Sequence, residues 1–192
     1  FSQGNCMLSG PASAWQLSSG TMGFSKGKWF WEVRYEGGTV GNYHTGVIDE
    51  TANNFGSTHG QAGVTTLYNG EGGEIFTGSD GLFTAADYGT IDTSSDVLGV
   101  ACNFDDGQIS YYINGSIVVT NHALDSTTNN KNTLFPLSVQ HGSSQVTKYN
   151  FGGCSGFTVS SAVNDANGYG NFEYAVPSGY YSLCTKNLAT YG

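Results

Sequence analysis

Positive charge is scarce in this sequence. Six Lys and Arg residues stand against fifteen Asp and Glu residues, so the formal net charge is -9 at pH 7, and only 11% of residues are charged. Proteins that bind nucleic acid or an anionic membrane surface carry clusters of basic residues. The composition therefore predicts that neither of these is a partner.

Long apolar runs are also missing. No stretch approaches the roughly 18 residues that a membrane-spanning helix needs, and the start of the chain has no basic and apolar secretion signal. We therefore expect no membrane insertion. Because the chain begins at Phe1 and ends in the uncharged stretch LATYG, we expect a segment of a longer polypeptide.

Cysteine and histidine are few and scattered. The cysteines form no CxxC pair and the histidines no HExxH spacing, so we predict no metal site. We expect the cysteines to be buried free thiols. A disulfide between Cys6 and Cys184 is an alternative that their spacing does not decide. The residues are Cys6, Cys102, Cys154, Cys184, His44, His59, His122 and His141.

Enzyme signatures are absent from the sequence. There is no GxSxG elbow for a serine nucleophile, and the stretches GQAG and GEGG lack the strand and helix that flank phosphate-binding loops. We predict no catalytic residue and no cofactor. A Ser-His-Asp set formed only in space and a surface calcium ion stay open as alternatives. The acidic residues considered for calcium are Glu71, Glu74, Asp80, Asp87 and Asp92.

Glycine and aromatic residues, in contrast, are abundant. The chain has 29 glycines in 192 residues, roughly twice the usual ~7%, and aromatics reach 14%. Disordered chains are poor in aromatics, so this composition indicates a folded protein with many turns. The length suffices for a buried core, and we predict one domain over residues 1–192.

The segment KWFWEVRY, residues 28–35, alternates like a strand with one buried face. The other face is expected to be solvated, where a Glu32–Arg34 pair would contribute little, ~0 to 1 kcal/mol. The buried face would comprise Trp29, Trp31, Val33 and Tyr35.

Two turn signals organise the middle of the chain. The runs GVACNF and QISYYI flank Asp105-Asp106-Gly107, and Asn114-Gly115 separates QISYYI from SIVVT. An Asn-Gly pair between β-rich runs is a strong hairpin signal, because both central positions need positive φ. We therefore predict that the two aspartates are turn residues, not a site, and that the NGS sequence at Asn114 is a turn, not a glycosylation acceptor.

The C-terminal half continues in the same manner. TLFPLSVQ and QVTKYNFGG are predicted to be a strand pair around HGSS, and a bend at Pro177 and Gly179 is predicted to precede a last strand. Short strands with turn signals every 8 to 12 residues are typical of an all-β, antiparallel β-sandwich.

Five stretches in this order resemble the successive blocks of a SPRY domain, the core of B30.2 modules, from about Gly20 to Leu188. They are SKGKWFWEVRY, TGVIDE, DVLGVACNFDDGQISYYINGS, LFPLSVQHGSSQVTKYNFGG and FEYAVPSGYYSLCTKNL. The resemblance implies a bent sandwich of two antiparallel sheets with concanavalin-like jelly-roll architecture, long Gly-rich loops and a binding role, not an enzymatic one. The stretch LYNGEGGEIF and the closing block resemble the forms found in bacteriophage and viral proteins.

Aromatic residues in segments expected to be loops are the candidate ligand-binding residues, since their rings offer large and rigid contact area. They are Tyr43, Phe55, Tyr68, Phe76, Phe83 and Tyr88.

The sequence leads to three hypotheses for function. The first is a non-enzymatic recognition module of a phage or virus structural protein, such as a tail fibre, head fibre or capsid protein. It would lie on the virion surface, contact other virion proteins or a host-surface protein or glycan, and form a homotrimer. The second is an intracellular B30.2-type adaptor that binds a peptide. The third is a carbohydrate-binding or carbohydrate-processing sandwich.

Overall fold

The computed structural model describes most of the chain. The described residues are 6–10, 14–37, 43–52, 65–77, 82–84, 87–91, 95–125, 132–142, 144–153 and 156–192.

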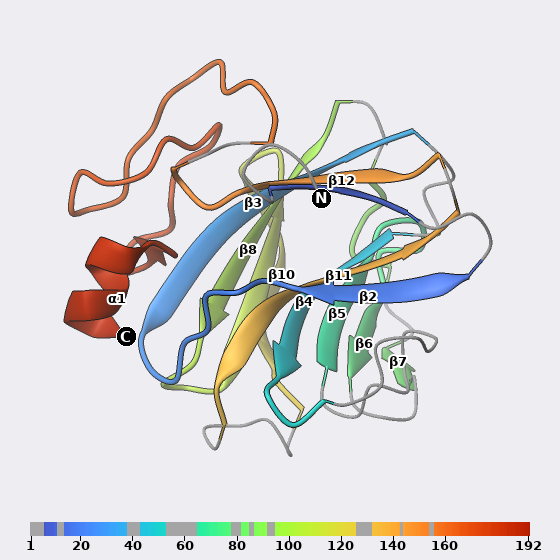
Figure 1. Ribbon diagram of the computed structural model, residues 1–192, viewed down its shortest axis with the longest axis horizontal. Helices are drawn as coiled ribbons and strands as arrows, with labels where there is room; N and C mark the ends of the chain where they lie inside the picture. Colours follow the sequence, from blue (N-terminus) through green and yellow to red (C-terminus); the bar gives the residue numbers. More distant parts are fainter. Residues whose placement is uncertain are drawn as a thin grey trace.

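Two antiparallel sheets pack face to face as a β-sandwich, which confirms the predicted fold class (Figure 1). Sheet A runs in the order β1 (Met7–Ser9), β12 (Val146–Asn150), β3 (Lys28–Glu36), β8 (Val97–Asn103), β9 (Gln108–Ile113) and β10 (Ser116–Ala123). Sheet B runs in the order β2 (Trp15–Ser19), β11 (Leu134–His141), β4 (Tyr43–Asp49), β5 (Thr65–Asn69), β6 (Ile75–Thr77) and β7 (Leu82–Thr84).

The core between the sheets follows the period of two that the sequence predicts for β3. Alternate side chains of β3, β8 and β9 point inward against those of β4, β5 and β6, and nearly all are buried. The largest are Trp29, Trp31, Tyr35, Tyr43, Tyr68 and Tyr111.

Both predicted turns of sheet A are confirmed. Gly107 has a φ of 63° between β8 and β9, and Asn114 and Gly115 have φ values of 50° and 78° between β9 and β10. The Asp105 carboxylate accepts a hydrogen bond from the Gly27 amide at 2.7 Å. The Asp106 carboxylate accepts one from the Asn103 side chain at 2.6 Å, so both aspartates hold the turn.

The predicted pairing of TLFPLSVQ with QVTKYNFGG is wrong. Both segments are strands, but β11 pairs with β2 and β4 in sheet B, while β12 pairs with β1 and β3 in sheet A. The connection between them therefore crosses from one sheet to the other. Turn residues between two strands look alike in a sequence whether they close a hairpin or join two sheets.

Tyrosine hydroxyls tie the two sheets together inside the core. Tyr149 of β12 reaches across to sheet B, where its hydroxyl lies 2.9 Å from the Thr45 hydroxyl and donates to the Leu137 carbonyl at 3.1 Å. Tyr43 of β4 reaches in the opposite direction and donates to the Glu36 carbonyl at 2.9 Å. Each tyrosine thus fills the core with its ring and satisfies its polar end on the other sheet.

The outer face of β3 is covered, not solvated as predicted. The C-terminal segment, residues 156–192, lies beside sheet A (orange to red in Figure 1) and packs Phe172 against Phe30. Beneath it the fully buried Glu32 carboxylate accepts hydrogen bonds from the Glu173 amide at 3.0 Å and the Tyr174 amide at 2.8 Å. Arg34 does not pair with Glu32; its guanidinium lies over the Phe157 ring.

The predicted bend at Pro177 and Gly179 and the strand after it are both present, but the strand is short and a helix that the sequence did not predict follows it. After a two-residue strand, β13 (Tyr181–Ser182), which pairs in parallel with β3, the chain forms the helix α1 (Thr185–Tyr191). The buried Asp165 carboxylate joins these elements, because it accepts hydrogen bonds from the Ser182 amide at 2.9 Å and the Asn187 side chain at 2.8 Å. Seven residues at the end of a β-rich chain show too little periodicity to predict a helix.

Replacing Tyr149 by Phe removes one tie between the sheets without opening a cavity. We expect the Tyr149→Phe variant to lose about 1 kcal/mol of unfolding free energy, measured by urea denaturation. Tyr169→Phe is the matched control, because the Tyr169 side chain is 38% exposed. Equal stability of the two variants would contradict a stabilising role for the hydroxyl of Tyr149.

Asp165→Asn places an amide group where the carboxylate accepts hydrogen bonds from Ser182 and Asn187. We expect this variant to lose about 2 to 3 kcal/mol of unfolding free energy. Burial opposes ionisation of Asp165, but its hydrogen bonds with Ser182, Tyr169 and Asn187 outweigh this, so its pKa lies below the ordinary 3.8. The advantage of the wild type should therefore be complete above that pH and disappear as the pH falls through the lowered pKa. A difference that does not change with pH would contradict this.

Glu32→Gln should show the opposite pH dependence. Burial raises the pKa of Glu32 above the ordinary 4.5, and hydrogen bonds from Glu173, Tyr174 and Asn150 offset only part of the rise. Protonation of Glu32 is then easier in the folded than in the unfolded chain, so acidification from neutral pH should stabilise the wild type relative to Glu32→Gln. Urea denaturation across this range measures the difference; an advantage of the wild type that shrinks on acidification would be the contrary result.

Candidate functional site

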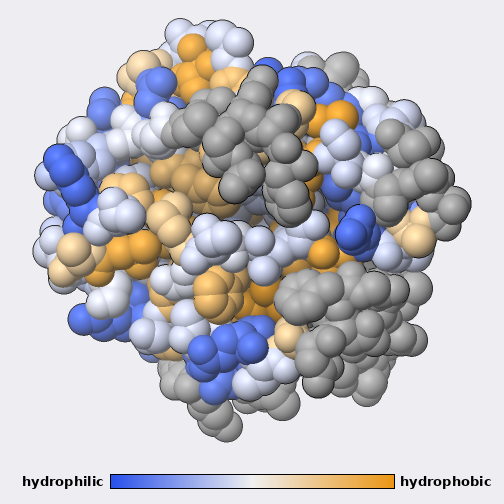
Figure 2. Space-filling model, in the orientation of Figure 1, coloured by the Kyte–Doolittle hydropathy of each residue, from blue (hydrophilic) through white to orange (hydrophobic). Residues whose placement is uncertain are grey.

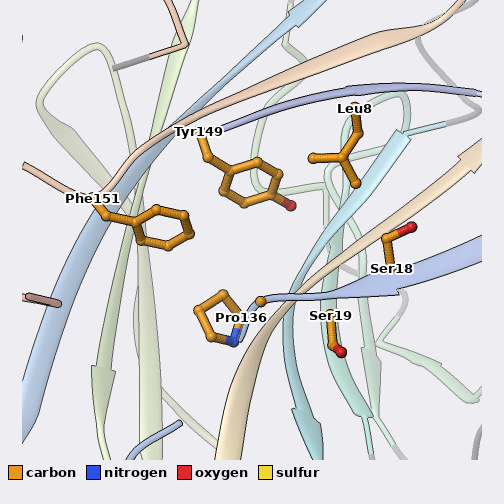
Figure 3. A pocket seen from close by; sticks show the side chains of 7 residues that line it. Leu8, Ser18, Ser19, Pro136, Tyr149 and Phe151 are labelled. Atoms are coloured by element: carbon orange, nitrogen blue, oxygen red, sulfur yellow. The ribbon is translucent and has the colours of Figure 1, made fainter. Parts of the chain in front are cut away.

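A shallow groove opens between the edges of the two sheets, where β1 and β12 face β2 and β11. Leu8 and Tyr149 line it from sheet A, Ser18 and Pro136 line it from sheet B, and Phe151 lies at one end (Figure 3). We call it the inter-sheet groove. In the space-filling view, hydrophobic residues are visible in the hollowed centre of this face (Figure 2). The full lining is Leu8, Ser18, Ser19, Gly20, Pro136, Tyr149 and Phe151.

Pro136 explains why the groove opens at this point. Its carbonyl accepts a hydrogen bond from the Gly20 amide at 2.8 Å, but proline has no N–H to return the second bond of the ladder. The pairing of β2 with β11 ends here, after Ser19 and Leu137. The two segments pair again at Phe24 and Leu134, so the ladder is interrupted only between these points, beside the apolar lining.

The opposite wall is held rigidly. The rings of Tyr149 and Phe151 stack with their centroids 5.5 Å apart, and the hydroxyl of Tyr149 is fixed on Thr45 and Leu137. Burial raises the pKa of Tyr149 to about 12. Among the described residues that line the groove, Tyr149 is the one with a titratable side chain, and none of them could act as a general base at neutral pH.

The size of the groove limits what it can hold. Its volume is about 30 Å³, which is about the volume that one molecule occupies in liquid water. Pockets for drug-sized ligands and cofactors measure about 300 to 1,000 Å³. The groove therefore suits a single small apolar group presented by a larger surface, not an enclosed ligand.

The prediction that the candidate aromatics lie in loops is wrong for Tyr43, Tyr68 and Phe76. These residues belong to β4, β5 and β6, and their side chains are buried. Tyr43 and Tyr68 point into the core, whereas Phe76 belongs to a buried cluster that includes Leu67 and Ile48. The strands are short and surrounded by glycine, which hides their alternation in the sequence.

The other three candidates have different outcomes. Tyr88 is half-buried and packs against the core between the sheets. Phe83 lies in the strand β7, so it is not a loop residue either, and Phe55 is outside the described residues. The structure does not bring the described side chains of Tyr43, Tyr68, Phe76 and Tyr88 together into one exposed site, and ligand binding by any of the six candidates stays a prediction.

The cysteines and histidines do not form a metal site in the described residues. No group of three His, Cys, Asp or Glu side chains there lies close enough to hold a metal ion. No disulfide joins Cys6 to Cys184, so that alternative is not realised, and Cys154 lies outside the described range. His44 and His141, distant in sequence, both contact the ring of Trp15, at 5.2 and 5.1 Å between centroids.

The residues of the inter-sheet groove were not among the sequence candidates. Two signals pointed toward them: a proline inside an otherwise regular strand, at Pro136, and the alternation of Tyr149 with Phe151. What the sequence did not contain is the pairing of β11 and β12 in different sheets, which places these residues on opposite walls.

Comparisons with known proteins identify the family. The SPRY domain family model matches residues 28–154. The crystal structure of the SPRY domain of human HERC1 superposes with a TM-score of 0.60 at 15% identity, covering 74% of this chain and 86% of that domain. A second human SPRY domain gives a TM-score of 0.56 at 18% identity, covering 76% and 91%.

No curated protein matches the sequence. Likeness at these identities concerns the fold, which agrees with the two antiparallel sheets described above. No helix in the described ranges is long and apolar enough to cross a membrane. Because the family model matches more than half of the residues, the chain belongs to the SPRY domain family.

Proposed function

We propose that the chain is a non-enzymatic recognition module of a phage or virus structural protein, exposed on the virion surface. It would contact another virion protein or a host-surface protein or glycan. The observation that carries the interaction role is the inter-sheet groove of a SPRY domain, which has an apolar lining and no general base at neutral pH. The virion role is supported by the low charge and by the resemblance of the Gly-rich and closing blocks to phage forms.

A protein is the partner that fits the groove best. Space for about one water molecule accommodates a methyl-sized group, which would anchor a partner whose remaining contacts spread over the surrounding surface. Such a contact is weak by itself. Presentation as a homotrimer, which we include in the proposal, would convert weak contacts into avidity.

An intracellular B30.2-type adaptor is the second candidate. It is favoured by the source of both solved structures, which are human SPRY domains, one of them from HERC1. The remainder of the gene separates the candidates. Neighbouring tail or capsid genes favour the virion role, and adjoining RING or coiled-coil segments favour the adaptor.

The virion role predicts where the protein occurs. Antibodies against residues 1–192 should label intact particles in immunogold electron microscopy, and peptides of the chain should sediment with these particles in mass spectrometry. Recovery from the soluble cell fraction alone, with unlabelled particles, would contradict the proposal.

The groove predicts a loss of function when its apolar wall is removed. A particle carrying Phe151→Ser should lose infectious titre by a factor of about ten or more, because truncated apolar anchors typically cost over 1 kcal/mol of binding. Ile117→Ser is the matched control, because it also replaces an apolar side chain by serine. Ile117 is 49% exposed and lies on β10, at the opposite edge of sheet A from the groove.

Ser18→Leu provides a second test that removes no packed side chain. It should fill the groove from β2 and lower the titre, while circular dichroism and thermal melting show a folded protein. Titres of Phe151→Ser and Ser18→Leu equal to that of Ile117→Ser would rule out the groove as the contact site.

A further inference from the structure

A second hollow lies where β3 begins, beside β13 and α1. It measures about 250 Å³ and is open to solvent. We call it the C-terminal hollow, because part of its wall comes from the last residues of the chain. Its lining is Lys26, Gly27, Lys28, Asp105, Gly179, Tyr181 and Tyr191.

One wall of this hollow is an aromatic stack. The rings of Tyr181 and Tyr191 lie 4.1 Å apart at an angle of 4°. The pairing of β13 with β3 sets Tyr181 opposite Trp29, and the Tyr191 hydroxyl is 3.3 Å from the side-chain nitrogen of Asn167. The half-exposed rings are therefore fixed before any ligand arrives.

The other wall is charged, and hydrogen bonds hold its backbone and the Asp105 carboxylate. The Gly27 amide donates to the Asp105 carboxylate at 2.7 Å, and the Trp29 indole donates to the Lys26 carbonyl at 2.7 Å. Lys28 lies 3.8 Å from Asp106, whereas Lys26 is exposed and forms no ion pair with another described residue. Two of the six basic residues of a chain with net charge -9 thus line one hollow.

We propose that the C-terminal hollow binds a saccharide and favours one that carries a carboxylate. A sugar ring presents apolar C–H groups that pack on an aromatic ring and hydroxyls that bond to carboxylate and ammonium groups. None of the described residues that line the hollow is Ala, Val, Leu or Ile, so an apolar peptide anchor would find little matching surface there. Asp106 balances the charge of Lys28, so Lys26, which forms no ion pair with another described residue, supplies the positive charge that favours an acidic sugar.

Most of the hollow lies outside the part of the chain that the family model matches, although Lys28 and Asp105 lie within it. Lys26, Gly27, Gly179, Tyr181 and Tyr191 lie outside the matched residues 28–154. The inference rests on the proposed recognition role only in taking a glycan as one partner class. It concerns a different surface from the inter-sheet groove, so the two can be tested separately.

Amide chemical shifts of the isotope-labelled 192-residue protein provide the test. Glucuronic acid should shift the amides of Gly27, Asp105 and Tyr181 with a dissociation constant of about 1 mM, and glucose should shift the same amides with weaker binding. Lys26→Ala should weaken glucuronic acid binding by a factor of about ten and leave glucose binding unchanged. This exposed lysine can be replaced without affecting the fold.

Substitutions of Tyr191 test whether the tyrosine stack binds the sugar ring. Tyr191→Ala should weaken both sugars by a factor of about ten, while Tyr191→Phe, which keeps the ring, should bind both. Tyr169→Ala is the matched control, because Tyr169 contacts Lys186 outside the hollow. Phe151→Ser should bind both sugars like the wild type, which separates this inference from the groove.

The inference is overturned if neither sugar shifts the amides around the hollow, or if the shifts lie elsewhere. Equal glucuronic acid binding by Lys26→Ala and the wild type would overturn the preference for a carboxylate.

Discussion

The burial of both faces of β3 is the constraint on which the rest of the structure depends. Its inward face supplies Trp29, Trp31 and Tyr35 to the core between the sheets. Its outward face places Phe30 and the Glu32 carboxylate under the C-terminal segment, where the Glu173 and Tyr174 amides bind that carboxylate. A carboxylate without these donors would be costly to bury, so the fold of the sandwich and the docking of the last residues are linked.

The inter-sheet groove and the C-terminal hollow both follow from this arrangement. The inter-sheet groove lies where β12, which pairs with β3, presents Tyr149 toward sheet B, beside the interruption of the β2–β11 ladder at Pro136. The C-terminal hollow exists because β13 pairs with the start of β3 and brings Tyr181 next to Lys28. The groove is small and apolar, whereas the hollow is larger, aromatic and charged, so they suit different kinds of partner.

Local patterns in the sequence predicted much of the fold and little of the site. The alternation in KWFWEVRY and the Asn114-Gly115 turn depend on neighbouring residues, and both are confirmed. The solvated face expected for Glu32 is wrong, because its cover comes from residues about 140 positions later. The sheet change between β11 and β12, which creates the groove, and the contact of Tyr181 with Tyr191 beside Lys26 likewise depend on tertiary packing that no local pattern contains.

Native-state hydrogen exchange tests most directly whether the C-terminal segment and β3 form one cooperative unit. The account predicts that the amides of Glu173, Tyr174 and Ser182 exchange with the same opening free energy as the amides of β3, because the first two bind Glu32 and the third binds Asp165. Fast exchange of these three amides, with β3 still protected, would contradict it.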